Sequence, residues 1–442
     1  MNIFSIFKPA AQQEIIQDEK IVAKKYRYWR IRTFYGMYVG YAAFYLTRKS
    51  FTFAMPAISA NLGYDKTQLG ILGSVLAISY GISKFLSGIV SDKSNPRYFM
   101  AVGLMLTGLC NILFGLSSLF VLFVLFWGLN GWFQGWGWPP CAKLLTHWYS
   151  QSERGRWWSV WNTSHNLGGA AIPVIAAFCA SHFGWRYAMF VPGVFCILIG
   201  LFLINRLRDT PQSLGLPSVE VFRKDDSYKT EEKKDVILTT KQILFEYVLT
   251  NKFIWVLALS YFFIYAVRQA VNDWSMLYLV EEKSYSSVRA GATVCWFEVG
   301  GFFGSLVAGW ASDSIFKGKR GPVNAIFTFF ILSSVFAMWK LTGHNFLFDA
   351  IIIFSVGFFI FGPQMLIGVA AAELSHKNAA GTATGFAGTF AYAGAAMAGG
   401  PLGAMMDAWG WEGFFIILAI CATVALLLLS PLWNVRSNLR HS

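Results

Sequence analysis

Four basic side chains lie within apolar stretches of the sequence: Arg48, Lys49, Lys84 and Arg268. A charge inside a membrane-spanning helix costs about 2.5 kcal/mol or more at the centre of the bilayer, so such residues persist where they face a cavity, a partner or a ligand. Guanidinium groups stay protonated at physiological pH and donate several hydrogen bonds to carboxylate or phosphate oxygens. The pattern therefore predicts a cavity that binds an anion, and a phosphoryl group suits a pair of arginines.

Aromatic and polar neighbours could border the same cavity. Tyr41 and Tyr45 precede Arg48 by seven and three positions, and Tyr265 precedes Arg268 by three, so in a helix these rings share the faces of the arginines. Their hydroxyl groups can then reach a polar ligand. The other candidates from this pattern are Gln134 and Trp138 in GWFQGWGWPP and Asn162 in WNTSHNLGGA.

A histidine and two acidic residues complete the set of candidates. His165 lies within an apolar span and could donate to phosphate, with an ionisation near neutral pH. Lys49 is expected to be a member of an ion pair, and Asp273 and Glu298 are the acids available to it or to Arg268. Two alternatives stay open: Arg48 can extend its guanidinium to the membrane surface, and His165 can be an interior histidine with satisfied hydrogen bonds. The remaining histidines are assigned no role: His147, His182, His344, His376 and His441.

The composition describes the elements that must position these side chains. The chain has 442 residues, of which 55% are hydrophobic, 17% aromatic and only 13% charged, which is typical of a polytopic membrane protein. A helix needs about 18 or more apolar residues to cross the bilayer. We predict an all-α membrane protein with twelve spans, near residues 30–48, 69–90, 98–117, 119–141, 157–180, 187–205, 253–279, 290–311, 322–341, 347–370, 380–402 and 412–432.

The distribution of basic residues predicts the orientation of these spans. The net charge is +13, and most of the 36 Lys and Arg residues fall in the two ends and the even-numbered loops. Basic residues concentrate on the cytoplasmic side of membrane proteins, so the charge reflects topology, and a nucleic-acid partner is not expected. We predict a multi-pass protein of a bacterial inner membrane with both termini cytoplasmic. The six cysteines lack C-x-x-C spacing and are expected to be packing residues.

Two halves of the sequence repeat each other. The motif Y-x3-Y-x2-R ends at Arg48 and again at Arg268, and GIVSD from Gly88 recurs as GWASD from Gly309. Such self-similarity indicates a duplication. The predicted division is a cytoplasmic arm 1–29, a six-helix half 30–205, a cytoplasmic inter-half loop 206–252, a second six-helix half 253–433 and a cytoplasmic tail 434–442.

This plan resembles that of the major facilitator superfamily, in which two halves related by an axis along the membrane normal enclose a site at mid-membrane. The loop after Gly88 is similar to the superfamily's loop signature between the second and third spans. The resemblance implies that this loop acts as a cytoplasmic latch. Its members are Gly88, Asp92, Lys93 and Arg97, with Asp313 in a degenerate second copy.

Longer motifs are similar to those of the organophosphate:phosphate antiporter family. They include GYAAFYLTRKSF, SYGISKFLSGIVSDKSNPRYFM, NGWFQGWGWPPCAKLL and ERGRWWSVWNTSHNLGGA, and the resemblance extends over nearly the whole chain. Within the family, SERGRWW and FGPQMLIG are most like the subgroup of hexose 6-phosphate transporters and hexose-phosphate uptake regulators.

The resemblance implies roles for individual residues. Arg48 and Arg268 match the family's two phosphate-binding arginines, and Lys84 and His165 match the neighbouring cation and histidine. Residues that match positions lining the cavity are Tyr41, Tyr45, Tyr265, Trp138 and Tyr392, and residues that match an ion-pair switch are Lys49, Asp273 and Glu298. Phe361 departs from the pattern, because glycerol-phosphate transporters have a tyrosine there; this puts a glycerol 3-phosphate substrate in doubt.

The function we expect is exchange of a sugar phosphate, such as glucose 6-phosphate, for inorganic phosphate by alternating access, in a monomer without cofactor or metal. The alternative from another class is a membrane receptor that senses external glucose 6-phosphate for a histidine kinase. A proton-coupled symporter for a neutral sugar is disfavoured, because the expected cavity is cationic. The sequence has no Walker A loop, HExxH, C-x-x-C or G-x-S-x-G motif, so neither ATP hydrolysis nor an enzyme is expected.

Overall fold

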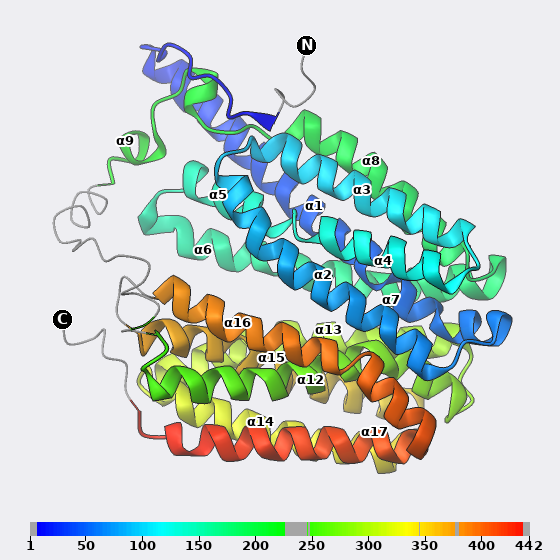
Figure 1. Cartoon of the computed structure of the whole chain (residues 1–442). Helices are drawn as coiled ribbons and strands as arrows, with labels where there is room; N and C mark the ends of the chain where they lie inside the picture. The colour runs from blue at the N-terminus through cyan, green and yellow to red at the C-terminus, as the bar shows by residue number, and fades with distance from the viewer. Residues whose placement is uncertain (1–6, 226–244, 246–247, 344, 376–379, 436–442) are drawn as a thin grey trace. The chain divides into compact units, whose positions relative to one another are not determined.

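The structure is a computed structural model that describes residues 7–225, 245, 248–343, 345–375 and 380–435. Every regular element among these residues is a helix (Figure 1). Residues 436–442 of the expected tail 434–442 and residues 226–244 and 246–247 of the expected inter-half loop 206–252 lie outside the described residues. The predicted fold class, an all-helical membrane protein, is confirmed.

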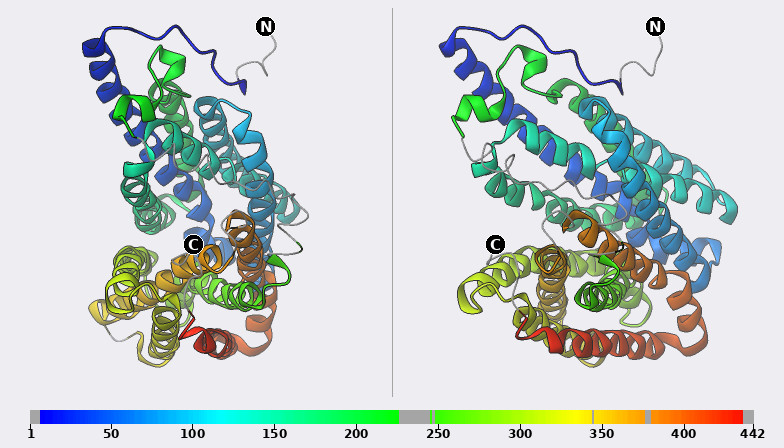
Figure 2. Two further views of the ribbon diagram at one scale, coloured as in Figure 1. Left: turned by 90° about the vertical axis from the view of Figure 1, so that its left-hand side faces the viewer. Right: turned by 60° about the vertical axis from the view of Figure 1, so that its left-hand side comes forward.

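The first helix, α1 (Glu19–Leu62), is much longer than its expected span 30–48. Figure 2 shows it in dark blue, with the N-terminal arm leading to its first turn. Asp18 begins the helix, because its Oδ1 accepts from the Lys20 nitrogen at 2.8 Å. Gly63 ends it, with a φ of 69° that favours glycine. The described arm pairs with a later segment: the Gln13 and Ile16 nitrogens donate to the Gln212 and Gly215 oxygens.

The next elements are α2 (Lys66–Asp92), α3 (Pro96–Leu116) and α8 (Tyr187–Arg206). Asn95 caps α3 by accepting from the Arg97 nitrogen at 3.1 Å, and Pro96 takes the first helical position, where its missing N–H is not needed. Glycines bring α3 and α8 together, since a Cβ at Gly108 would lie 2.5 Å from the Gly193 oxygen.

Two of the expected spans are broken helices. The span expected at 119–141 is α4 (Phe120–Gln134) followed by α5 (Trp138–Trp148), and the span expected at 157–180 is α6 (Gln151–Asn162) followed by α7 (Ser164–Phe183). The first break follows from Pro139, which cannot donate to the oxygen of Gly135 four positions earlier. Ser87 of α2 supplies the missing donor, with its Oγ 2.7 Å from that oxygen.

The second part of the chain contains longer helices. They are α12 (Lys252–Glu281), α13 (Ser287–Trp310), α14 (Arg320–Leu341), α15 (Phe346–Glu373), α16 (Ala380–Met397) and α17 (Gly400–Leu429). Gly410 kinks α17 with a φ of 64°, just before the span expected at 412–432. Short helical turns complete the set: η2 (Gln212–Leu214), α9 (Val219–Arg223), η4 (Ala311–Ile315) and η6 (Ser430–Leu432).

Nine stretches of helix among the described residues are long and apolar enough to cross a membrane. The last of them, Thr382–Leu432, contains two of the expected spans. The expected span 119–141 falls outside the nine because its helix is broken, and the expected span 30–48 because tyrosine, glycine and basic residues lower the mean hydropathy of α1. The protein is therefore multi-pass.

Contacts divide the chain into two compact units. Unit 1 comprises residues 1–51, 79–172 and 186–235, and unit 2 comprises residues 52–78, 173–185 and 236–442. In unit 1, a Cβ at Gly168 of α7 would collide with the Ala42 oxygen of α1. In unit 2, a Cβ at Gly394 of α16 would collide with the Phe262 oxygen of α12. Gly168 and Gly394 are 226 positions apart, and Ala42 and Phe262 are 220 apart, as are Arg48 and Arg268. Corresponding positions of the predicted repeat therefore make the same contact.

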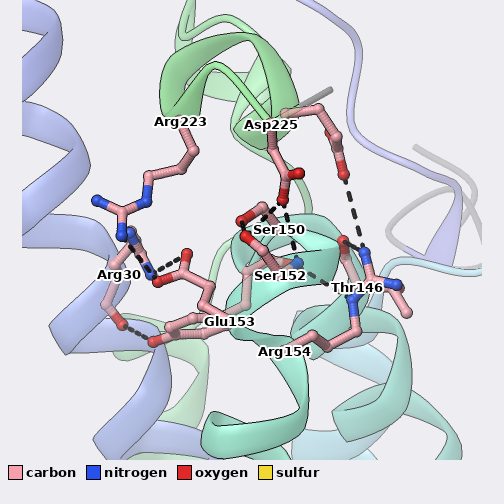
Figure 3. Close-up of polar contacts among 10 residues, drawn as sticks. Arg30, Thr146, Ser150, Ser152, Glu153, Arg154, Arg223 and Asp225 are labelled. Atoms are coloured by element: carbon pink, nitrogen blue, oxygen red, sulfur yellow. Dashed lines mark hydrogen bonds and ion pairs between the residues drawn. The ribbon is translucent and has the colours of Figure 1, made fainter. Parts of the chain in front are cut away.

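A polar cluster fastens residues 220–225 to the rest of unit 1 (Figure 3). Glu153 lies between two arginines, with an oxygen 2.5 Å from Arg30 and the other 3.3 Å from Arg223. Asp225 accepts from the nitrogen and hydroxyl of Ser152 at 3.0 and 2.6 Å. We call these contacts, together with the ion pair of Arg154 and Glu220 at 3.8 Å, the loop clamp.

Candidate functional site

Arg48 of α1 is held from two other helices of unit 1. Its Nε donates to Gln134 Oε1 of α4 at 3.2 Å. Its Cζ lies 4.4 Å from the ring centroids of both Tyr45 and Tyr80, and Tyr80 belongs to α2. Aromatic faces attract a guanidinium, so the two rings fix the plane of the side chain. The guanidinium therefore faces other helices of its unit.

The amide of Gln134 connects the break after α4 to this arginine. Its nitrogen donates to the Phe44 oxygen at 3.0 Å and to Thr47 Oγ1 at 3.1 Å, both on α1. Because the nitrogen is bonded in this way, the oxygen is turned toward Arg48. Gln134 is buried, so the amide cannot swing into solvent. The structure therefore places Gln134, which the sequence predicts to line the cavity, beside Arg48.

His165 lies close to the arginine's aromatic neighbours. Its ring centroid is 5.6 Å from that of Tyr45, and Tyr41 in turn packs against Trp161 at 4.8 Å. The Nδ1 of His165 bonds to the backbone oxygen of Asn162. A carbonyl oxygen can only accept, so Nδ1 carries the proton, and Nε2 is an acceptor in the neutral ring. The Asn162 side chain is exposed, so only its backbone belongs to this group.

Lys84 joins the group through aromatic rings. Its Nζ lies 5.4 Å from the Trp138 ring and 6.0 Å from the Tyr80 ring. Trp138, which the sequence predicts to line the cavity, begins α5 directly after the break. The contacts run from Lys84 to Tyr80, Arg48, Tyr45 and His165. Unit 1 therefore brings together three of the predicted phosphate-binding side chains.

Arg268 of α12 has an equivalent setting in unit 2. It is buried, and its Cζ lies 5.5 Å from the Tyr265 ring and 4.9 Å from the Phe361 ring. Tyr265 contacts both Tyr261, at 4.8 Å between centroids, and Tyr392, at 6.0 Å. Two of the predicted cavity residues of this unit, Tyr265 and Phe361, thus contact its arginine, and the third, Tyr392, contacts Tyr265.

A protein-family model matches this sequence. The model described as "Major Facilitator Superfamily" matches residues 37–399, which include both arginines. The chain belongs to this superfamily. A solved structure of a bacterial homologue of the human lysosomal transporter Spinster aligns with a TM-score of 0.74, over 93% of this chain and 98% of that chain. The two sequences are only 12% identical, so this likeness confirms the major facilitator fold alone.

Two relatives narrow the position of the chain within the superfamily. The "Probable hexose phosphate transport protein" of Chlamydia pneumoniae is 59% identical over 98% of both chains. The "Membrane sensor protein UhpC" of Escherichia coli is 50% identical over 97% of this chain and 98% of its own. These relatives confirm the predicted organophosphate:phosphate antiporter subgroup of the superfamily.

The three residues of the expected ion-pair switch belong to two different units. Lys49 belongs to unit 1, and Asp273 and Glu298 belong to unit 2; all three are buried. Asp273 accepts from Gln269 Nε2 at 2.6 Å and from Thr52 Oγ1 at 3.4 Å, and Glu298 accepts from Asn272 Nδ2 at 3.3 Å. The ion pair between Lys49 and these acids stays a prediction.

The structure describes part of the expected cytoplasmic latch. Arg97 donates to the Ile204 oxygen of α8 at 2.5 Å, Lys93 is exposed, and Gly88 lies on α2; the side chain of Asp92 lies outside the described part. In the second copy, Arg320 bridges Asp313 at 2.6 Å and Glu373 at 2.8 Å. A latch function stays a prediction. His344, His376 and His441, to which the sequence analysis assigns no role, lie outside the described residues.

The sequence analysis did not include Tyr80 among the residues of the site. It precedes Lys84 by four positions in SYGISK, and Tyr45 precedes Arg48 by three; both separations put the two side chains on one face of a helix. The sequence could not reveal the contact of Tyr80 with Arg48, because that contact joins two different helices. Glu373 was missed for the same reason: it meets Arg320 only through the packing of α14 on α15.

Proposed function

We propose that this protein exchanges a sugar phosphate, such as glucose 6-phosphate, for inorganic phosphate across the bacterial inner membrane, by alternating access and without a cofactor. The observation that carries the proposal is the equivalent setting of Arg48 and Arg268. Each lies on the first helix of its repeat and contacts one aromatic ring of that helix and one of another helix. The name of the Chlamydia relative supports hexose phosphate as the substrate class.

In the mechanism we propose, the two arginines bind one phosphoryl group between them. Two guanidinium groups repel each other, so an empty transporter resists bringing them together. A phosphoryl dianion removes this repulsion and accepts charge-assisted hydrogen bonds from both repeats. Only the loaded protein then changes easily between its two states, since a ligand shifts an equilibrium by its differential affinity for them.

Exchange follows from this requirement for a loaded protein. Phosphate must leave by the same site through which the ester enters, so the outward gradient of phosphate drives uptake and ATP is not needed. The excess of basic residues in the predicted cytoplasmic segments supports cytoplasmic termini, and hence the direction of this uptake. Lys84 and His165 would assist Arg48 as further donors in unit 1.

The test replaces each arginine with lysine, which keeps the charge but loses the paired donors. Arg48→Lys and Arg268→Lys should each lower phosphate exchange in proteoliposomes by about 10- to 100-fold, as expected for a charge-assisted hydrogen bond of about 1.5–3 kcal/mol. The matched control is Arg186→Lys, since Arg186 is outside the site and donates to Ser118 at 2.7 Å. Wild-type exchange in either site variant, with a folded protein, would exclude the mechanism.

A second candidate function is sensing, which the 50% identity to UhpC favours. A sensor would bind glucose 6-phosphate but exchange phosphate very slowly, and it would act on a membrane histidine kinase. Counterflow of labelled phosphate by the purified protein separates the two functions. Rapid counterflow supports transport, whereas tight binding with negligible counterflow, and a kinase gene beside this one, would support the sensor.

A further inference from the structure

A cavity of about 460 Å³ lies in unit 1 between α2 and α5. Lys84 and Gly88 line it from α2, and Trp138, Lys143, Thr146 and His147 from α5. Its volume falls within the range of about 300–1,000 Å³ that is typical of small-molecule sites. Only Lys84 and Trp138 of this set belong to the candidate site described above, so the cavity extends that site along α5.

The spacing of the lining residues gives the cavity its chemistry. Lys143, Thr146 and His147 are three and four positions apart, so they share one face of α5. Lys84 and Gly88 are likewise one turn apart on α2. A Cβ at Gly88 would meet nothing within 4 Å, so the wall is recessed at that point. Two lysines, a hydroxyl and an imidazole therefore border a space that could hold an oxyanion.

The charge of Lys143 is balanced by an acid outside the lining. Its Nζ donates to the Ser94 oxygen at 2.7 Å and lies 3.7 Å from Asp209 Oδ1. The other oxygen of Asp209 accepts from the Ala10 nitrogen at 2.8 Å. At 3.7 Å, the ion pair is longer than a charge-assisted hydrogen bond, so an anion in the cavity can compete with Asp209 for the ammonium group.

His147 suits the neutral, hydrogen-bonding role in such a site. Burial lowers its pKa below the ordinary value, and the positive charge of Lys143 lowers it further, while Asp209 and Glu220 oppose the shift and Arg154 adds to it. The imidazole is therefore neutral at physiological pH and offers one donor and one acceptor.

We propose that this cavity is a second binding site for a phosphoryl oxyanion, in which Lys84, Lys143 and His147 supply the donors. The inference rests on the proposed function and extends it: Lys84 is shared, so the anion can pass between this site and Arg48 without leaving a cationic surface. The tail of a phosphate ester would rest on the Trp138 ring.

Two substitutions with opposite expected effects test the proposal. Lys143→Gln removes a ligand charge and should weaken binding, whereas Asp209→Asn removes the competing charge and should strengthen it. If Lys143 only stabilises the fold through Asp209, the two substitutions break the same pair and act in the same direction. Asparagine keeps an oxygen for the Ala10 nitrogen, so Asp209→Asn changes little else.

The measurement is equilibrium binding of radiolabelled inorganic phosphate to the purified full-length protein that carries Arg48→Lys, which weakens the first site. We expect Lys143→Gln to weaken phosphate binding about fivefold and Asp209→Asn to tighten it about fivefold, the size expected for one partly screened charge. Lys143→Arg should restore binding. The control is Lys24→Gln, which removes an exposed charge near the start of α1 and should change nothing.

Further arms separate the outcomes. If glucose 6-phosphate displaces labelled phosphate from this site, the site also binds the ester. If it does not, the site binds only inorganic phosphate. Unchanged phosphate binding in both variants, or shifts in the same direction, would overturn the inference while leaving exchange through the arginines intact. Opposite shifts in a protein whose exchange survives Arg48→Lys and Arg268→Lys would instead uphold the second site and reject the proposed function.

Discussion

Each of the two arginines meets one aromatic ring from its own helix and one from another helix. For Arg48 these are Tyr45 and Tyr80, and for Arg268 they are Tyr265 and Phe361. The rings on the same helix could be predicted from sequence, because helical spacing fixes which side chains share a face. The rings from other helices could not, since periodicity says nothing about which helix packs on which.

Phe361 leads to a prediction about substrate choice. Its ring lies 4.9 Å from Arg268 and packs against Gly301, where a Cβ would be 2.5 Å from the ring. The ring offers no hydroxyl to a small polar substrate. Glucose 6-phosphate should therefore compete better than glycerol 3-phosphate for phosphate exchange, and Phe361→Tyr should narrow the difference in inhibition constants by about 10-fold, the effect of one hydrogen bond of about 1 kcal/mol or slightly more.

Competition assays in proteoliposomes measure both inhibition constants. The control is Phe297→Tyr, on a ring that packs 5.7 Å from Phe361 but has no contact of its own with Arg268 among those described. A wild-type protein that prefers glycerol 3-phosphate would contradict this interpretation of Phe361.

At the scale of helices, the sequence predicted where spans lie better than how they are interrupted. The expected spans at 187–205 and 322–341 agree with α8 and α14 within a few residues. The break between α4 and α5 was missed, although Pro139 and Pro140 mark it. Prolines are tolerated in membrane helices when neighbours satisfy the freed carbonyl groups, and the hydroxyl of Ser87, which does so, lies on another helix.

Close helix packing at the equivalent glycines gives a prediction about stability. Gly168→Ala and Gly394→Ala should each destabilise the protein by about 1–3 kcal/mol, because the added methyl group would collide with the backbone oxygen of Ala42 or Phe262. Thermal unfolding of the detergent-solubilised protein measures the effect. Gly155→Ala, on a helix where a Cβ meets nothing within 4 Å, should leave the melting temperature equal or higher. Equal melting temperatures for all three variants would refute this account of the helix packing.

At the scale of the molecule, the sequence predicted the superfamily and the duplication correctly. Both rest on motifs repeated at a constant spacing, which survive in the structure as the equivalent arginine sites and glycine contacts. The ion pair predicted for Lys49 with Asp273 or Glu298 stays a prediction, because these residues belong to different units. The division into halves at 206–252 also stays a prediction.

The orientation of the chain in the membrane is open to a direct test. If both termini are cytoplasmic, a cysteine at Leu119, which is exposed between α3 and α4, should react with a membrane-impermeant maleimide in intact cells. A cysteine at Lys24, exposed near the start of α1, should react only in everted vesicles. The unsubstituted protein is the control, since four of its six cysteines are buried and two half-buried. The reverse labelling pattern would invert the predicted topology.

The loop clamp bears on how the gene can be engineered. Because Glu220, Arg223 and Asp225 are anchored to Arg154, Glu153 and Ser152, the start of the connecting segment folds with the preceding helices. A foreign domain or a chain break placed after Asp225 leaves every one of these bonds within a single polypeptide, whereas one placed before Asp209 would also separate that carboxylate from Lys143. The natural junction for coexpressed fragments is therefore downstream of Asp225, well past the last residue of α8.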